Sequence, residues 1–347
     1  MSGATAAGES GHQRRRELSV DEHVDGVLAG DRVALARTIT LIESDAVAHQ
    51  EKAQAVLRRL LPHAGRSIRV GVTGAPGAGK SSLIEVLGMR LVEAGHRLAV
   101  LAIDPSSRLT HGSILGDKTR MELLSRDPRC FIRPSPTGGT LGGVARKSRE
   151  TVVACEAAGF DVVLIETVGV GQSEVEVRSM VDFFLLLLIP GAGDELQGIK
   201  RGVMELADLL VVNKADGELR QRALAARAEH ERAVHYLQPA TRGWRTAALA
   251  CSALGGEGIG EIWDVVERFR RETERSGVFE ERRLEQARAW MRSLIDDELR
   301  TRFYGHPGIA HLLPELERQV VDGTLAATAA VSLLLASWNA SAADRER

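Results

Sequence analysis

A glycine-rich stretch places a lysine and a serine where they could hold the phosphate groups of a nucleotide. Residues 74–82 read Gly-Ala-Pro-Gly-Ala-Gly-Lys-Ser-Ser, which fits the P-loop pattern Gly-x-x-x-x-Gly-Lys-Ser. In this pattern the glycines let backbone N–H groups point at phosphate oxygens, the lysine reaches the β- and γ-phosphates, and the serine hydroxyl ligates Mg²⁺. The predicted nucleotide-binding residues are Gly74, Ala75, Pro76, Gly77, Ala78, Gly79, Lys80, Ser81 and Ser82.

The segments on either side of this loop are of the kinds that a P-loop requires. Residues 67–72 are a short β-branched run, which predicts a strand, and residues 83–94 carry apolar side chains at helical spacing before Gly95. A strand therefore leads into the loop, and the loop leads into a helix N-terminus with its unpaired N–H groups. The alternative is a plain glycine turn with a solvated lysine, and the flanking elements disfavour it.

A second motif would select the base. Asn213-Lys214-Ala215-Asp216 follows the apolar run 209–212. An aspartate here can accept hydrogen bonds from the N1–H and the exocyclic amine of guanine, whereas adenine would leave its carboxylate unpaired. Residues 252–254 follow the last apolar run and fit a loop that closes over the base, with a plain turn as the alternative. The residues predicted to recognise the guanosine are Asn213, Lys214, Asp216, Ser252, Ala253 and Leu254.

Three carboxylates could act on the metal ion that accompanies the phosphates. Glu166 follows the run 162–165 and begins Glu-Thr-Val-Gly, where GTPases usually have Asp-x-x-Gly with the glycine N–H at the γ-phosphate. Asp104 follows the run 98–103 and Asp117 lies in the next loop, so both could reach the metal through water, although helix capping is the alternative. The predicted metal ligands are Ser81, Asp104, Asp117 and Glu166, and Gly169 is added to the nucleotide-binding residues.

The departure from the usual pattern at Glu166 predicts slow hydrolysis. Glutamate carries its carboxylate about one bond further into the site than aspartate does. No glutamine directly follows Gly169, and the nearest, Gln172, comes three residues later. Because a glutamine often orients the attacking water in such enzymes, we expect weak intrinsic hydrolysis that a partner raises.

The loop of residues 190–200 is long, rich in glycine and charged. It follows the most apolar run in the chain, and loops of this kind are often functional. A plain solvated loop is the alternative. The residues predicted to respond to the bound nucleotide are Asp194, Glu195, Gln197 and Lys200.

Strand and helix patterns alternate from residue 67, which predicts an α/β fold with a mostly parallel sheet flanked by helices. The predicted strands are residues 68–72, 98–103, 162–165, 183–189, 209–212 and 247–251. We divide the chain into a disordered tail (1–16), a helical cap (17–64), a P-loop core (65–261) and a helical extension (262–347). Residues 280–303 of the extension carry an apolar stripe, which packs either on its own domain or on a second subunit. The stripe comprises Leu284, Ala287, Trp290, Met291, Leu294 and Leu299.

Composition excludes several classes of protein. The 347 residues carry a net charge of −2, which gives no reason to expect binding to nucleic acid or an anionic membrane. The longest apolar run, residues 183–189, is far too short to span a bilayer. Cys130, Cys155 and Cys251 have no paired spacing, which predicts neither a disulfide framework nor a zinc site. No apolar segment of a secretory signal precedes the cap, so we expect a cytoplasmic protein.

Taken together, these motifs resemble one family. The sequence is similar to the methylmalonyl-CoA mutase-associated GTPases of the MeaB/ArgK type, in the SIMIBI class of P-loop GTPases. The resemblance spans roughly residues 18–305, and Glu-Thr-Val-Gly-Val-Gly-Gln-Ser-Glu at 166–174 is its most specific piece. The other matching stretches are residues 30–32, 74–82, 104–107, 116–121, 193–200 and 213–216.

The resemblance implies more than the motifs do alone. Such proteins are homodimeric GTPases that act as chaperones of an adenosylcobalamin-dependent acyl-CoA mutase, gating the loading of its cofactor. By this likeness residues 104–120, 166–172 and 191–200 would be three switches, and the catalytic residues would be Lys80, Asp104, Glu166 and Lys200. The chain would bind GTP or GDP with Mg²⁺. By the same resemblance the corrinoid would belong to the mutase.

Two other functions fit the same superfamily less well. A nickel-insertion GTPase usually has a His-rich or Cys-x-x-Cys site, and the sequence has neither. A kinase acting in amino-acid uptake would need a pocket for a phosphate acceptor, and Asn213–Asp216 favours guanine over adenine.

Overall fold

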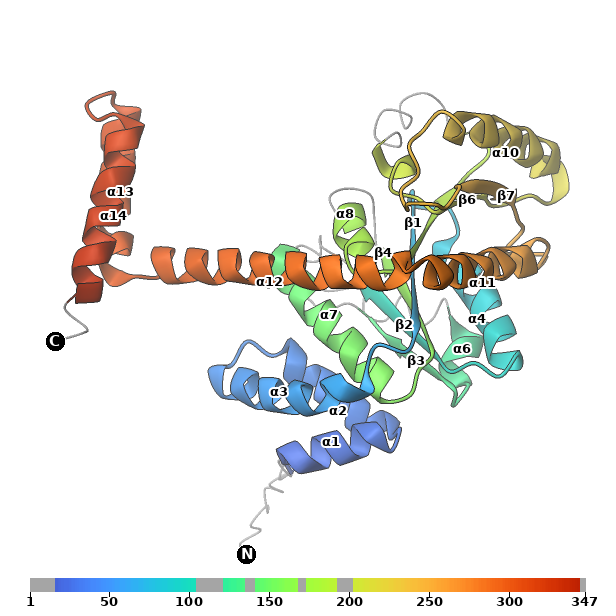
Figure 1. Cartoon of the computed structure of the whole chain (residues 1–347), viewed down its shortest axis with the longest axis horizontal. Coiled ribbons are helices and arrows are strands. Elements are labelled where there is room, and N and C mark those ends of the chain that lie inside the picture. Colours follow the sequence, from blue (N-terminus) through green and yellow to red (C-terminus); the bar gives the residue numbers. More distant parts are fainter. Residues whose placement is uncertain (1–15, 104–120, 135–140, 168–172, 192–201, 344–347) are drawn as a thin grey trace, which may run out of the picture. The chain divides into compact units, whose positions relative to one another are not determined.

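The computed structural model describes residues 16–103, 121–134, 141–167, 173–191 and 202–343 (Figure 1). The chain divides into two compact units, residues 1–273 and 274–347. The four-part division made from the sequence remains a prediction.

The first unit is built on a seven-stranded sheet, which confirms the predicted fold class. Its strands lie in the order β3-β2-β4-β1-β5-β6-β7, and every pair of neighbours is parallel. Because parallel strands all end at the same edge, the loops that follow them meet there. The strands are β1 (Ile68–Gly74), β2 (Leu98–Ile103), β3 (Cys130–Arg133), β4 (Val162–Thr167), β5 (Phe183–Leu188), β6 (Leu209–Val212) and β7 (Ala247–Ala250).

Two of these strands differ from the prediction in ways that matter for the site. β3 was not predicted: it is a four-residue strand between Arg129 and Pro134, and it pairs only with β2 at the edge of the sheet. β4 continues to Thr167, so Glu166 lies within the strand, opposite Val72, rather than after it. Because the charged Glu166 interrupts the apolar run, the sequence pattern alone ends this strand before Glu166.

Helices cover both faces of the sheet, which explains why the strands are almost continuously apolar. On one face lie α7 (Leu141–Ala157), α8 (Ser173–Arg178) and α10 (Arg220–Val234) (Figure 1). On the other face, α4 (Lys80–Glu93) packs against β1, β2 and β4, with α6 (Glu122–Arg126) beside it. The ring of Phe269, on α11 (Ile259–Ser276), meets Phe183 of β5 edge to face, with ring centroids 5.0 Å apart.

The N-terminal cap lies on α7, on the side away from the sheet (Figure 1). It consists of α1 (Val20–Leu28), α2 (Arg32–Glu43), α3 (Val47–Leu60) and the short η1 (Leu61–His63). Asp31 caps α2, with its carboxylate 2.7 Å from the Val33 N–H. Leu35 and Ile39 join the core that α7 and the sheet share.

Ion pairs and hydrogen bonds also hold the cap to the core. Arg133, the last residue of β3, binds Glu43 through two nitrogens. Lys147 Nζ lies 2.7 Å from Asp45 Oδ1, and Gln54 Nε2 donates to Glu150 Oε1 at 2.8 Å. The cap is therefore fixed to both β3 and α7.

The second unit consists of helices. α12 (Val278–Tyr304) is followed by α13 (Pro307–Val321) and α14 (Ala327–Ala343), which pack against each other around Ile309, Leu316 and Leu334. Along α12, four large apolar side chains are about half exposed: Leu284 at 58%, Met291 at 57%, Ile295 at 49% and Leu299 at 57%. Their spacing of seven, four and four residues puts them on one stripe of the helix.

Candidate functional site

The P-loop joins β1 to α4, and two of its glycines are required by close packing. A Cβ at Gly74 would run into the carbonyl oxygen of Leu187 on β5. A Cβ at Gly79 would lie 2.5 Å from the amide nitrogen of Asn213, and Gly79 also has a left-handed φ of 91°. Glycine is therefore needed to bring the loop against β5 and the Asn213 loop.

Lys80 points its ammonium group back into the loop. Its Nζ donates to the carbonyl oxygens of Gly74 at 2.8 Å and Ala75 at 3.3 Å, and the residue is only 9% exposed. Burial lowers the pKa of Lys80, while the nearby carboxylates of Glu166 and Glu174 act to raise it. This holds a positive charge at the mouth of a phosphate-binding loop.

Ser81 and Glu166 come together from different elements. Ser81 is the second residue of α4, and Glu166 lies near the end of β4. The serine Oγ donates to Glu166 Oε1 at 2.9 Å. The carboxylate is buried, at 5% exposed. Hydroxyl and carboxylate oxygens are the ligands that Mg²⁺ prefers, so this pair fits the metal ion that accompanies a nucleotide.

Asn213 connects the P-loop to the loop after β7. Its Nδ2 donates to the Ala78 carbonyl at 2.8 Å, and its Oδ1 accepts from the Ala253 N–H at 3.0 Å. The side chain is 2% exposed, so both bonds are buried. The amide of Asn213 therefore holds the P-loop and the loop after β7 in one arrangement.

Two residues that are predicted to recognise the base, Asp216 and Ser252, are also joined by a hydrogen bond. The Ser252 hydroxyl donates to Asp216 Oδ2, and Ser252 Oγ accepts from the Gly255 N–H at 2.8 Å. Lys214, between Asn213 and Asp216, has a φ of 61°, the one positive φ at a non-glycine residue in the described part of the chain. Leu254 is 92% exposed. The loops after β6 and β7 thus hold the Asp216 carboxylate at the edge where the P-loop also lies.

Seven of the predicted site residues lie outside the described residues. They are Asp104, Asp117, Gly169, Asp194, Glu195, Gln197 and Lys200. Within the part of the chain that the structure describes, no three His, Cys, Asp or Glu side chains gather as a metal site. No helix there combines the length and apolar character needed to cross a bilayer.

Two residues of the site were missed by the sequence analysis. The buried thiol of Cys251 lies 3.5 Å from Asn213 Oδ1, and burial raises its pKa to about 12, so it stays protonated and can donate. Glu174, in the first turn of α8, is 2% exposed, and its negative charge acts to raise the pKa of Lys80. Only the run Glu166–Glu174 drew attention to Glu174, and nothing in the sequence pairs Cys251 with Asn213.

Comparison with known proteins decides which family this site belongs to. The sequence model of the family described as methylmalonyl Co-A mutase-associated GTPase MeaB matches residues 35–307. The chain belongs to the MeaB family. It is therefore a P-loop GTPase.

Individual proteins that are similar to this MeaB-family chain match it over nearly its whole length. A putative GTPase of Caulobacter vibrioides is 53% identical over 321 residues, covering 92% of this chain and 98% of that protein. The mouse protein named methylmalonic aciduria type A homolog, mitochondrial, is 46% identical over 334 residues, covering 93% of this chain and 80% of that protein. The crystal structure of a protein named LAO/AO transport system kinase superposes with a TM-score of 0.75 at 36% identity, covering 92% of this chain and 97% of that one.

Proposed function

We propose that the protein is a GTP-hydrolysing chaperone of an adenosylcobalamin-dependent acyl-CoA mutase, with methylmalonyl-CoA mutase as the first candidate. The match to the mutase-associated GTPase family over residues 35–307 carries this proposal. The name of the mouse relative, a methylmalonic aciduria type A homolog, supports it. The chaperone would gate the loading of the cofactor, which the mutase itself binds.

The described residues suit the hydrolysis of GTP. Water attacks the γ-phosphorus, the bond to the β–γ bridging oxygen breaks, and GDP and phosphate are released. Lys80 would stabilise the charge that grows on the β- and γ-phosphate oxygens, and Asp216 would hold the base. Ser81 and Glu166 would hold Mg²⁺, which when bound neutralises phosphate charge. The roles of Asp104, Asp117 and Gly169 are proposed on the sequence pattern alone.

The first test of the chaperone function measures phosphate release from GTP with and without the mutase of the same organism. We expect the mutase to raise the rate, because Glu166 replaces the usual aspartate and no glutamine follows Gly169. Lys200→Ala should keep its affinity for GDP but lose this increase, as expected if residues 191–200 relay the state of the partner. Equal stimulation of the Lys200→Ala variant would contradict the relay, and no stimulation of the unaltered protein would contradict the chaperone.

The same assay separates a GTPase from a kinase, the activity for which the protein of the similar crystal structure is named. A GTPase releases one phosphate for each GDP formed, whereas a kinase transfers the phosphoryl group to an acceptor and releases less.

We also propose a cytoplasmic location, because all three cysteines are free and buried. Cell fractionation with an antibody to the protein would test it.

We further propose that the protein is a homodimer and that the apolar stripe on α12 forms its interface. Leu284, Met291 and Ile295 leave a continuous apolar surface about half exposed, which a second copy would bury. The double variant Met291→Lys/Ile295→Lys should sediment as a monomer of 37.5 kDa. Ser293→Lys, which adds a lysine on the opposite side of α12, should remain a dimer. A dimer that persists in the double variant would place the interface elsewhere.

A further inference from the structure

Two buried threonines join the P-loop strand to the strand that carries Glu166. The side-chain oxygens of Thr73, on β1, and Thr167, the last residue of β4, lie 2.9 Å apart, so one hydroxyl donates to the other. Both residues are fully buried. Thr73 directly precedes the first glycine of the P-loop, and Thr167 directly follows Glu166. The pair therefore connects the segment that leads to Ser81 with the segment that carries Glu166.

The hydroxyl pair lies where the backbone pairing between these two strands ends. β1 and β4 pair in parallel up to Val72 and Glu166. Each strand continues further with its other neighbour, β1 with β5 up to Gly74 and β4 with β2 up to Thr167. Between β1 and β4 themselves, the bond from Thr73 to Thr167 therefore extends the pairing by one residue, through side chains instead of the backbone.

The threonine pair and the bond between Ser81 and Glu166 lie on opposite faces of the sheet. Ser81 belongs to α4, which packs against one face of β1 and β4. Because successive side chains of a strand point to opposite faces, Thr167 points away from the face on which Glu166 meets Ser81. On β1, the residue two positions before Thr73 is Gly71, where a Cβ would lie 2.9 Å from a valine side chain of α8. The threonines therefore face α8.

A bound Mg²⁺ would affect these two bonds differently. Mg²⁺ demands near-ideal octahedral geometry from its ligands, so the backbone that carries a ligand must be held closely. Ser81 and Glu166 are both proposed ligands, and the bond between them can rearrange when the ion enters. Thr73 and Thr167 point to the other face and would keep their bond. The threonine pair can therefore hold the end of β4 against the P-loop strand with or without the ion.

We propose that Thr73 and Thr167 are positioning residues, whose hydroxyl bond holds the backbone of Glu166 where its carboxylate can bind Mg²⁺ beside the nucleotide. This inference rests on the proposed metal site of Ser81 and Glu166, but it does not depend on the proposed chaperone function. A pair of valines has nearly the same shape as the pair of threonines. Replacing both partners of a buried hydrogen bond by apolar groups of the same shape changes stability little, so a double valine variant separates the loss of the bond from a loss of folding.

The test measures how much saturating Mg²⁺ tightens the binding of a fluorescent, non-hydrolysable GTP analogue to the full chain, as a ratio to its affinity in EDTA. Because the binding of metal and nucleotide is linked, this ratio falls when a contact between the metal and the protein is lost. In Thr73→Val/Thr167→Val we expect the ratio to fall about three- to tenfold, the equivalent of one hydrogen bond, with the affinity in EDTA unchanged. Thr73→Ser keeps the hydroxyl and should keep most of the ratio.

Two further variants make the result specific. Thr273→Val removes another buried hydroxyl, which donates to the Phe269 carbonyl of its own helix, and it should leave the ratio unchanged. Glu166→Gln should lower the ratio at least as much as the double valine variant does. A lowered ratio in Glu166→Gln together with an unchanged ratio in the double valine variant would overturn this inference alone. An unchanged ratio in Glu166→Gln as well would contradict the metal site itself.

Unfolding in urea shows whether the threonine pair acts only on the fold. We expect the double valine variant to unfold at nearly the same urea concentration as the unaltered protein. If it unfolds at a much lower concentration and also binds the analogue more weakly in EDTA, the threonines support the fold and the proposal is wrong. A ratio as low in Thr73→Ser as in the double valine variant would also contradict the proposal, because the hydroxyl would then not be what positions Glu166.

Discussion

Replacing Lys80 with methionine should lower the rate of GTP hydrolysis by roughly 10²–10³-fold, the usual effect of removing one preorganised donor to transition-state charge. The ammonium group is held at the P-loop by the carbonyl oxygens of Gly74 and Ala75, at 2.8 and 3.3 Å. Methionine keeps a stem of similar length but has no charge and no donor. Phosphate release under saturating and limiting GTP would show whether binding, turnover or both are lost.

The same substitution should change the free energy of unfolding by no more than about 1.5 kcal/mol, because two effects oppose each other. The variant loses the hydrogen bonds to Gly74 and Ala75. It also loses a buried charge, whose pKa is lowered by desolvation. A lysine with a lower pKa in the folded state destabilises that state at every pH below its folded pKa, and the cost disappears as the pH rises through the unfolded value. Below the folded pKa of Lys80 this cost is present, so its removal there offsets the lost bonds.

Lys147→Met is the matched control for Lys80→Met. Lys147 is also 9% exposed, but it binds Asp45 of the cap rather than the P-loop. Its replacement should leave hydrolysis unchanged and cost less than about 1 kcal/mol of stability, since Asp45 is 82% exposed. A Lys80→Met variant that hydrolyses GTP at the unaltered rate would remove Lys80 from the mechanism. If Lys80→Met instead unfolds at a much lower urea concentration than the unaltered protein, the lysine supports the fold.

The parts of the site that could be predicted from sequence are those encoded in consecutive residues. The P-loop depends on glycines at fixed spacing between a strand and a helix, and the structure has that order in β1 and α4. Asn213 and Asp216 follow β6, which in a parallel sheet ends at the same edge as β1. The motifs and the predicted parallel sheet together therefore place both loops at one edge.

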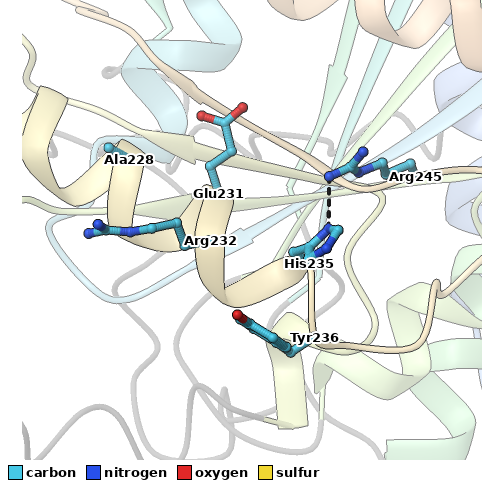
Figure 2. A pocket seen from close by; sticks show the side chains of 6 residues that line it. All are labelled: Ala228, Glu231, Arg232, His235, Tyr236 and Arg245. Atoms are coloured by element: carbon cyan, nitrogen blue, oxygen red, sulfur yellow. Dashed lines mark hydrogen bonds between the residues drawn. The ribbon is translucent and has the colours of Figure 1, made fainter.

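Contacts between distant segments could not be predicted in this way. Nothing in the sequence indicates that the Asn213 amide donates to Ala78 or that the Cys251 thiol faces Asn213, because both contacts depend on which strands become neighbours. Strand β3 was missed because it is short and pairs on one side only, so it lacks the continuous apolar run of the central strands. The contact between His235 and Arg245 likewise forms only when the end of α10 meets the start of β7 (Figure 2).

Replacing Asp216 with asparagine should abolish the preference for GTP over ATP and shift the preference toward xanthosine triphosphate. Guanine offers two donors, the N1–H and the exocyclic amine, and a carboxylate can accept both. Asparagine has one acceptor and one donor, so its NH₂ group would face the guanine amine. The loss of one charge-assisted bond and the unpaired donors should cost about 2–4 kcal/mol, which is roughly 30- to 1000-fold in affinity. Xanthine has a carbonyl in place of that amine and would restore the pairing.

Removing the Ser252 hydroxyl, which donates to Asp216 Oδ2, should lower guanine affinity in the same way but by less. Ser252→Ala would leave the carboxylate in place but less well oriented, so guanine affinity should fall by about tenfold or less. Asp264→Asn, which removes the same charge from an exposed position of α11, should leave nucleotide preference unchanged. Competition of GTP, ATP and xanthosine triphosphate for a fluorescent GDP analogue would measure all three variants under one condition.

These outcomes separate recognition of the base from binding of the phosphates. If Asp216 reads the base, Asp216→Asn keeps its affinity for xanthosine nucleotides, because the P-loop and Lys80 are unchanged, whereas Lys80→Met weakens the binding of every triphosphate alike. A uniform loss of affinity for all three nucleotides in Asp216→Asn would mean that the carboxylate mainly supports the loop through Ser252. That result would remove the physical basis for guanine specificity in this chain, since the predicted recognition depends on two acceptor oxygens at a single residue.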